Sequence, residues 1–322
     1  MFFNHPRIKI KILISQFLAI VPFIIFIFVL FDLWYDTRRS LIFEQNLSTA
    51  KLYASYISKN NADIIGLSGT LTSEEVFNML LKSDYLSDKN KLKAVLKSVS
   101  SRHKDIDSVN LFSPDGSLIE SSLDYDLSKS QTSILDRGYF QQLVKSKKTV
   151  VSDPLVGRLS GKSVYLVASP LVIDGNIEYI VLISVEIDSL KKYFENALTS
   201  KNRLIIVTDS EDNIVFTLNS KSTDNLKTDV FKENYHIKIA RSGSNSIIDS
   251  EKLPLSEKLL LGYAVPASVN GFNWTVISAD SLDEVYLPII KTQSFFWLIL
   301  LASTLFALSV VSFFLRKIKI IY

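Results

Sequence analysis

Two long apolar segments bracket this chain and limit what it can fold into. Residues 12–33 and 295–315 are almost wholly apolar, whereas the stretch of about 260 residues between them has ordinary polarity. An apolar helix of about 20 residues is long enough to cross the hydrocarbon core of a bilayer. Pro22 in the first segment is compatible with a membrane helix. The pattern predicts transmembrane helices at 12–33 and 295–315, with one large polar region between them.

Basic residues beside the two segments predict the topology. Lysine or arginine stands at 7, 9 and 11 before the first segment, and at 316, 317 and 319 after the second. Because cytoplasmic flanks carry this excess, we expect residues 1–11 and 316–322 in the cytoplasm and the central region outside it. A cleaved signal peptide does not fit, since the apolar run is too long and the bulky, charged FDLWYDTRR follows it. We therefore expect a two-pass protein of the cell (inner) membrane.

Composition excludes several functional classes. The chain has no cysteine, so it can form neither disulfides nor thiolate metal sites. Its net charge of +3 is small and its basic clusters lie at the membrane ends, which argues against nucleic-acid binding. The three histidines are far apart in sequence, and neither H-E-x-x-H nor G-x-S-x-G occurs. We expect no enzyme, no cofactor and no metal.

One glycine-containing loop superficially suggests a nucleotide site. In GRLSGKS (157–163), three residues separate Gly157 from Gly161, whereas a phosphate-binding loop needs four. The loop also leads into an apolar strand pattern, so no helix N-terminus would face a phosphate. We interpret it as a loop that covers a pocket.

The central region begins with a helical pattern and continues with strands. Residues 37–67 contain no proline and carry apolar residues at helical spacing, which predicts a stalk helix leaving the membrane. Residues 108–122 read as strand, turn and strand around Pro114-Asp115-Gly116. The apolar runs at 164–172 and 177–187 are joined by Asp174-Gly175, a hairpin dipeptide, and predict buried central strands.

The same order of pieces occurs twice. Residues 203–219 repeat the strand–turn–strand pattern, and 259–282 parallel 163–190. Both long arms share an Ala-x-Pro (168–170 and 264–266), a turn dipeptide (174–175 and 270–271) and a closing Asp-Ser-Leu (188–190 and 280–282). Two unrelated hairpins would share the turn residues but not the other matches. The repeat predicts an α+β fold of two modules, 68–190 and 191–290.

These segments resemble the double Cache sensor domain of bacterial transmembrane receptors. The resemblance covers most of 41–282 and is carried by SVNLFSPDGSLIESS, DRGYF, VVSDPLVGRLSGKSVYLVASPLV, EYIVLISVEIDSL and LLLGYAVPASVNGFNWTVIS. It implies tandem PAS-like modules on a long N-terminal helix, flanked by two transmembrane helices. It also implies a homodimer, a ligand in the membrane-distal module (68–190), and a sensor region of the kind found in chemoreceptors, histidine kinases and diguanylate cyclases.

The resemblance further implies a ligand site. In the amino-acid-binding members, an arginine on the DRGYF turn holds the ligand carboxylate, aromatic rings close over it, and an aspartate takes the ammonium. Here Arg137 matches the arginine, Tyr139 and Phe140 stand at the aromatic positions, and Glu186 stands where the aspartate is expected.

The residues themselves leave alternatives open. A guanidinium can bind a carboxylate through two parallel hydrogen bonds, but Arg137 could equally form a structural bridge with Asp136 or Asp153. Tyr165 could face either the pocket or the core. The ligand-binding residues that we predict are Arg137, Tyr139, Phe140, Asp153, Tyr165 and Glu186.

The sequence thus predicts a membrane-anchored receptor that senses a small extracytoplasmic ligand, a carboxylate or an amino-acid-like metabolite. No output module lies within these 322 residues, so we expect the signal to pass to further chain or to a cytoplasmic partner. The alternative is a membrane-tethered solute-binding or accessory protein that acts through a partner without signalling itself.

Overall fold

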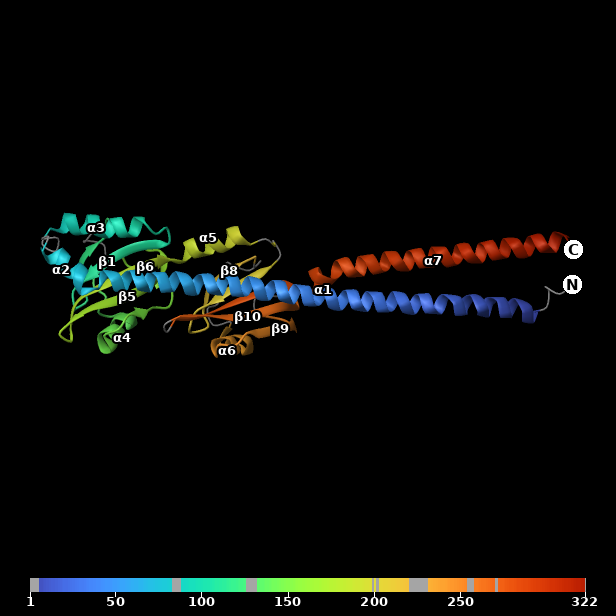
Figure 1. The fold of residues 1–322 in the computed structure, drawn as a ribbon, viewed down its shortest axis with the longest axis horizontal. Helices are drawn as coiled ribbons and strands as arrows, with labels where there is room; N and C mark the ends of the chain where they lie inside the picture. Colours follow the sequence, from blue (N-terminus) through green and yellow to red (C-terminus); the bar gives the residue numbers. More distant parts are fainter. Residues whose placement is uncertain are drawn as a thin grey trace.

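One helix organises the whole molecule. We describe the chain with a computed structural model that covers residues 6–82, 88–125, 132–198, 200, 203–219, 231–253, 258–269 and 272–321. Helix α1 (Pro6–Leu71) runs the length of the molecule, and two antiparallel sheets pack along its later part (Figure 1). The expected α+β fold, with two sheets on a long N-terminal helix, is confirmed.

The first sheet is built around the predicted hairpin. Its strand order is β2-β1-β6-β5-β3, with β4 also paired to β5. Asp174 and Gly175 have φ values of 49° and 79°, the left-handed backbone of a tight hairpin turn. The elements of this module are α2 (Glu74–Lys82), α3 (Lys89–Ser101), β1 (Ile106–Phe112), β2 (Leu118–Ser121), α4 (Gly138–Ser146), β3 (Val150–Val151), β4 (Leu155–Val156), β5 (Ser163–Ile173) and β6 (Asn176–Glu186).

The second sheet repeats the first. Its order is β8-β7-β11-β10-β9, so each strand takes the place of its counterpart and the predicted repeat is confirmed. The turn at 270–271 lies outside the described residues. The elements are α5 (Ile187–Ala197), β7 (Leu204–Thr208), β8 (Ile214–Leu218), α6 (Tyr235–Arg241), β9 (Ser246–Glu251), β10 (Leu260–Val269) and β11 (Phe272–Ser281).

A shared apolar core joins both sheets to α1. Buried residues of α1 recur at three- and four-residue spacing and face the sheets; they include Ala50, Tyr53, Ala54, Ile57 and Ile64. Tyr165 of β5 and Trp274 of β11 meet edge to face in this core, with ring centroids 5.5 Å apart. Because each ring belongs to a different sheet, the two modules are packed together as well as onto α1.

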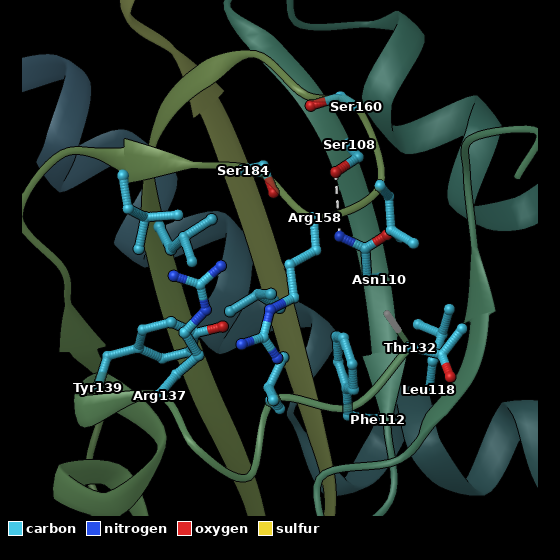
Figure 2. A pocket seen from close by; sticks show the side chains of 16 residues that line it. Ser108, Asn110, Phe112, Leu118, Thr132, Arg137, Tyr139, Arg158, Ser160 and Ser184 are labelled. Carbon is cyan, nitrogen blue, oxygen red and sulfur yellow. Dashed lines mark hydrogen bonds between the residues drawn. The ribbon is translucent and has the colours of Figure 1, made fainter. Parts of the chain in front are cut away.

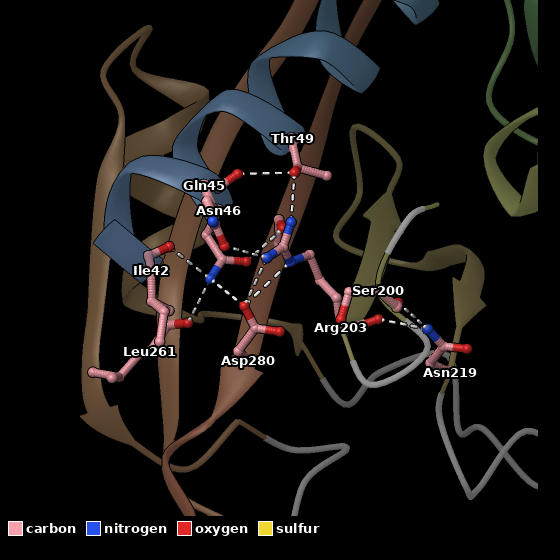
Figure 3. A network of polar contacts seen from close by, with 10 residues as sticks. Ile42, Gln45, Asn46, Thr49, Ser200, Arg203, Asn219, Leu261 and Asp280 are labelled. Atoms are coloured by element: carbon pink, nitrogen blue, oxygen red, sulfur yellow. Dashed lines mark hydrogen bonds and ion pairs between the residues drawn. The ribbon is translucent and has the colours of Figure 1, made fainter. Parts of the chain in front are cut away.

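A buried polar cluster fixes α1 on the second sheet (Figure 3). Asn46 of α1 donates to the Leu261 carbonyl (3.2 Å) and to Asp280 (2.8 Å). Arg203 pairs with the same Asp280 carboxylate at 3.0 Å and donates to Thr49 of α1 at 2.8 Å. Since the Arg203 and Asp280 side chains are only 8% and 14% exposed, this cluster is shielded from water. We refer to Asn46, Thr49, Arg203 and Asp280 as the α1 clamp.

The last helix returns along the first. Helix α7 (Leu282–Ile321) runs beside the N-terminal part of α1, so both ends of the chain lie at one end of the molecule (Figure 1). Tyr35 stacks on Tyr286 with centroids 4.4 Å apart. Within the described residues, no helix has a stretch both long and apolar enough to cross a membrane. The transmembrane helices predicted at 12–33 and 295–315 are therefore not confirmed by the structure.

Candidate functional site

A cavity opens on the face of the first sheet that points away from α1. Alternate residues of a strand point to opposite faces, and here Val109 and Ile183 pack toward α1 whereas Asn110 and Ser184 line the cavity. About 450 Å³ is empty between its walls, open solvent at the mouth included, and about 40 Å³ can hold the centre of a water molecule. This is room for a small polar molecule.

The floor of the cavity is polar. Ser108, Asn110 and Ser184 lie on the two central strands β1 and β6, and all three are buried. The Asn110 amide donates to the Ser108 hydroxyl at 3.0 Å and accepts from Ser121 at 2.5 Å. Buried polar groups are normally satisfied by hydrogen bonds, and Asn110 is locked by its two. The hydroxyls are positioned to meet polar atoms of a ligand.

Two arginines form the opposite wall. Arg137 is the N-cap residue of α4, and its guanidinium donates to the Val156 carbonyl at 3.4 Å. Arg158 reaches across the cavity from the loop after β4 (Figure 2), donates to the Ser133 carbonyl and pairs with Asp136. The hydrogen bond that Arg158 donates to Asp136 lowers the pKa of the Asp136 carboxyl.

A buried tyrosine lies close to both guanidiniums. Tyr139 of α4 lines the cavity, and in Figure 2 its hydroxyl lies near the side chains of Arg137 and Arg158. Burial raises the pKa of Tyr139 to about 12, although both arginines act in the opposite direction. The hydroxyl is thus protonated at neutral pH, and this wall presents hydrogen-bond donors with two positive charges.

The covering loop is held at its base. The Gly157 amide donates to the Lys162 carbonyl (2.9 Å), and the Gly161 amide donates to the Gly157 carbonyl (2.8 Å). Lys162 pairs with Asp107 at 3.0 Å and Glu186 at 3.3 Å, which ties the loop to the ends of β1 and β6. The hydrogen bond with Asp107 raises the pKa of Lys162.

The structure brings two of the six predicted residues into the cavity lining, Arg137 and Tyr139. Phe140 follows on the same helix turn but packs into the apolar core beneath α4. Tyr165 lies on the α1 face of the sheet, where the Asn60 amide donates to its hydroxyl at 3.4 Å.

The two predicted carboxylates lie outside the lining. Asp153 accepts hydrogen bonds from the Ser210 hydroxyl (2.7 and 2.6 Å) and the Ser210 amide (3.2 Å), in the turn between β7 and β8. Asp153 therefore connects the residues just before the covering loop to the second module. Glu186 is the N-cap residue of α5 and accepts from Ser189 at 3.2 Å.

Sequence reasoning missed most of the polar lining. The residues not singled out are Ser108, Asn110, Thr132, Arg158, Ser160 and Ser184. Ser108, Asn110 and Ser184 carry a readable signal. Ser108 and Asn110 alternate with Val109 and Leu111 along β1, and Ser184 lies between Ile183 and Val185 of β6, so the polar residues share one face of the sheet. Arg158 lies within GRLSGKS, the predicted pocket-covering loop, and no local pattern there points to the role of its arginine.

Comparisons with known proteins agree with this architecture. The family model described as Cache domain (dCache_1) matches residues 36–289. A search of curated proteins finds no significant match by sequence. Among solved structures, the periplasmic sensory domain of the Campylobacter jejuni chemoreceptor Tlp1 is similar at a TM-score of 0.60 and 12% identity, covering 78% of this chain and 99% of that one.

Two ligand-bound domains are also similar in fold. The ligand-binding domain of the Pseudomonas aeruginosa PAO1 amino acid chemoreceptor PctB with L-Gln has a TM-score of 0.55 and 14% identity, covering 76% of this chain and 92% of that one. That of the Pseudomonas fluorescens chemoreceptor CtaA with L-isoleucine has a TM-score of 0.55 and 12% identity, covering 78% and 95%. With two matching sheets on one long helix and a family match over most of its length, the chain belongs to the Cache domain family, in its double Cache form.

Proposed function

We propose that this chain is the sensor region of a bacterial transmembrane receptor and that it binds a small extracytoplasmic molecule in the cavity of the first module. The observation that carries the proposal is the cavity itself, where two arginines and a tyrosine face buried hydroxyls across an otherwise apolar hollow. Small-molecule sites are typically concave and apolar with a few convergent polar groups. The similar PctB and CtaA domains, solved with amino acids, support the same role.

The ligand carries a carboxylate or a comparable anionic group. Arg137 and Arg158 both line the cavity, and a guanidinium binds planar anions through charge-assisted hydrogen bonds. The protonated Tyr139 hydroxyl supplies a further donor on the same wall. The two arginines and Tyr139 would hold the anionic end while the serines of the floor meet the rest of the molecule.

Ligand binding would be transmitted through residues 153–163, the covering loop and the residues that lead into it. Leu155, Gly157 and Arg158 line the cavity, and Asp153 just before them is bonded to Ser210 of the second module. A ligand that prefers one position of this segment shifts the equilibrium between the two module arrangements by its differential affinity, about 1.4 kcal/mol for a 10-fold preference. The α1 clamp would pass the change to α1.

We propose a two-pass topology in which both ends of the chain are cytoplasmic. The apolar segments 12–33 and 295–315 and their basic outer flanks support it, as does the pairing of α1 with α7. The receptor would act as a homodimer, a state implied by the family, and pass its signal to a cytoplasmic module of further chain or of a partner.

Cysteine labelling tests this location, because the chain has no native cysteine to give a background. Ser160→Cys, in the half-buried covering loop, is expected to react with a membrane-impermeant maleimide in intact cells. Lys11→Cys, on the predicted cytoplasmic flank, should react only after permeabilisation. Labelling of Ser160→Cys only after permeabilisation would refute the extracytoplasmic placement.

A further inference from the structure

Among the residues that the structure describes, the charges that line the cavity are all positive. Of the described lining residues, Arg137 and Arg158 are ionised, and neither aspartate nor glutamate is among them. An α-amino acid brings an ammonium group as well as a carboxylate, and a buried ammonium needs a paired carboxylate or a full set of acceptors. Here its ammonium would enter a hollow that already holds two cations. The lining favours a ligand without a positive charge.

Arg158 can exchange its present partner for a ligand. The side chain of its partner Asp136 is 68% exposed, whereas the Arg158 side chain is 15% exposed. An ion pair with so exposed a carboxylate is weakened by solvent and salt. An anion inside the cavity would be less screened and could engage Arg158 and Arg137 together. Arg158 would thus contribute the second cationic contact.

The remaining polar groups are neutral. Ser108 and Ser184 line the floor of the cavity and Ser160 lies on its covering loop (Figure 2), and each hydroxyl can donate to an anionic oxygen. Nothing in this set offers a negative charge to a ligand ammonium. A ligand of charge −2 would neutralise the two guanidiniums and leave its other oxygens to the serines and Tyr139.

We infer that the ligand of this cavity is a small dianion, a dicarboxylate or a divalent oxyanion, and that Arg158 is the residue that selects it over an amino acid. The inference rests on the proposed function, since it assigns the ligand class of the same cavity. Both kinds of ligand carry a double negative charge, and separate probes distinguish a dicarboxylate from a divalent oxyanion.

Calorimetric titration of the purified full chain tests the assignment. The dianionic probes are succinate, malate and inorganic phosphate, and the amino-acid probes are L-glutamine, L-isoleucine and L-alanine. At least one dianion is expected to bind with a dissociation constant at least about 10-fold lower than any amino acid. Arg158→Gln should raise the dissociation constant of that dianion by about 10-fold or more, because a charge-assisted hydrogen bond is lost. Arg102→Gln, the same change on the exposed end of α3, should leave binding unchanged.

Asp136→Asn should change the affinity for a dianion in the opposite direction. It removes the carboxylate that competes for Arg158, so a dianion should bind about 3- to 10-fold more tightly. If Asp136 instead accepts a ligand ammonium, amino acids will bind to the wild-type chain and Asp136→Asn will weaken them. That result overturns the dianion assignment and leaves the proposed function standing. If a dianion still binds to both Arg137→Gln and Arg158→Gln, the dianion assignment is wrong and so is the proposal that this cavity is the binding site. If neither dianions nor amino acids bind to the wild-type chain, the dianion assignment is also wrong.

Discussion

Replacing Arg203 with methionine is expected to lower the unfolding free energy of the chain by about 3–5 kcal/mol. Arg203 gives the Asp280 carboxylate two hydrogen bonds, at 3.2 and 3.0 Å, and reaches α1 through Thr49. Methionine fills a similar volume but leaves the Asp280 carboxylate, which is only 14% exposed, without its cation. A buried carboxylate that loses its counter-charge is far more costly than the same position without any charge.

A double substitution separates the lost charge from the lost packing. Asp280→Asn in the Arg203→Met background should recover a large part of the stability, since no unpaired charge then remains. Denaturant unfolding of the full chain, followed by circular dichroism, measures each variant, and Arg102→Met on the exposed surface is the control. An Arg203→Met chain as stable as wild type would show that the α1 clamp does not hold α1 on the second sheet.

Gly262→Ala is expected to destabilise the second module by about 3 kcal/mol or more, the upper range for overpacking a filled core. A β-carbon at Gly262 of β10 would lie 2.1 Å from the Ser278 carbonyl oxygen and 2.6 Å from the Ala279 α-carbon. Both are atoms of β11, which pairs with β10 along its full length. Because the obstacle is backbone, the two central strands must separate to admit the methyl group.

Gly66→Ala is the matched control for this substitution. A β-carbon at Gly66 meets nothing within 4 Å, and the residue lies within α1. Alanine favours a helix over glycine by about 0.5–1 kcal/mol, so this variant should be more stable than wild type. Thermal unfolding of the two full-length variants should therefore shift in opposite directions. Equal melting temperatures would mean that β10 and β11 are not as close as the structure has them.

Much of the fold could be predicted because it depends on local signals. The hairpins were identified by their apolar runs, the Asp174-Gly175 turn and the repeated Asp-Ser-Leu ends. The two sheets have the same strand order, which the repeat anticipated. In the first of these ends, Asp188 lies within the first turn of α5, after the N-cap residue Glu186.

The cavity was harder to predict because its lining depends on which face of a strand each side chain points to and on contacts between distant parts of the sequence. Tyr165 could have faced either side of β5, and the aromatic packing with Trp274 places it in the α1 core. Asp153 meets Ser210, 57 residues further on, a contact that no local pattern can show. Arg158 crosses the cavity only because the loop folds back from β4, so its position depends on the tertiary structure.

If the cavity beside Arg137 binds a small molecule, the bound molecule will raise the melting temperature of the full chain. A library of small dianions, other carboxylates and amino acids should contain at least one compound that raises the melting temperature. A ligand at about 100 times its dissociation constant contributes about 2.7 kcal/mol, which corresponds to a shift of about 4 °C for a chain of this length. Arg137→Gln is expected to abolish this shift, whereas Arg102→Gln should retain it. A stabilising compound whose shift is the same in Arg137→Gln as in wild type would contradict this expectation.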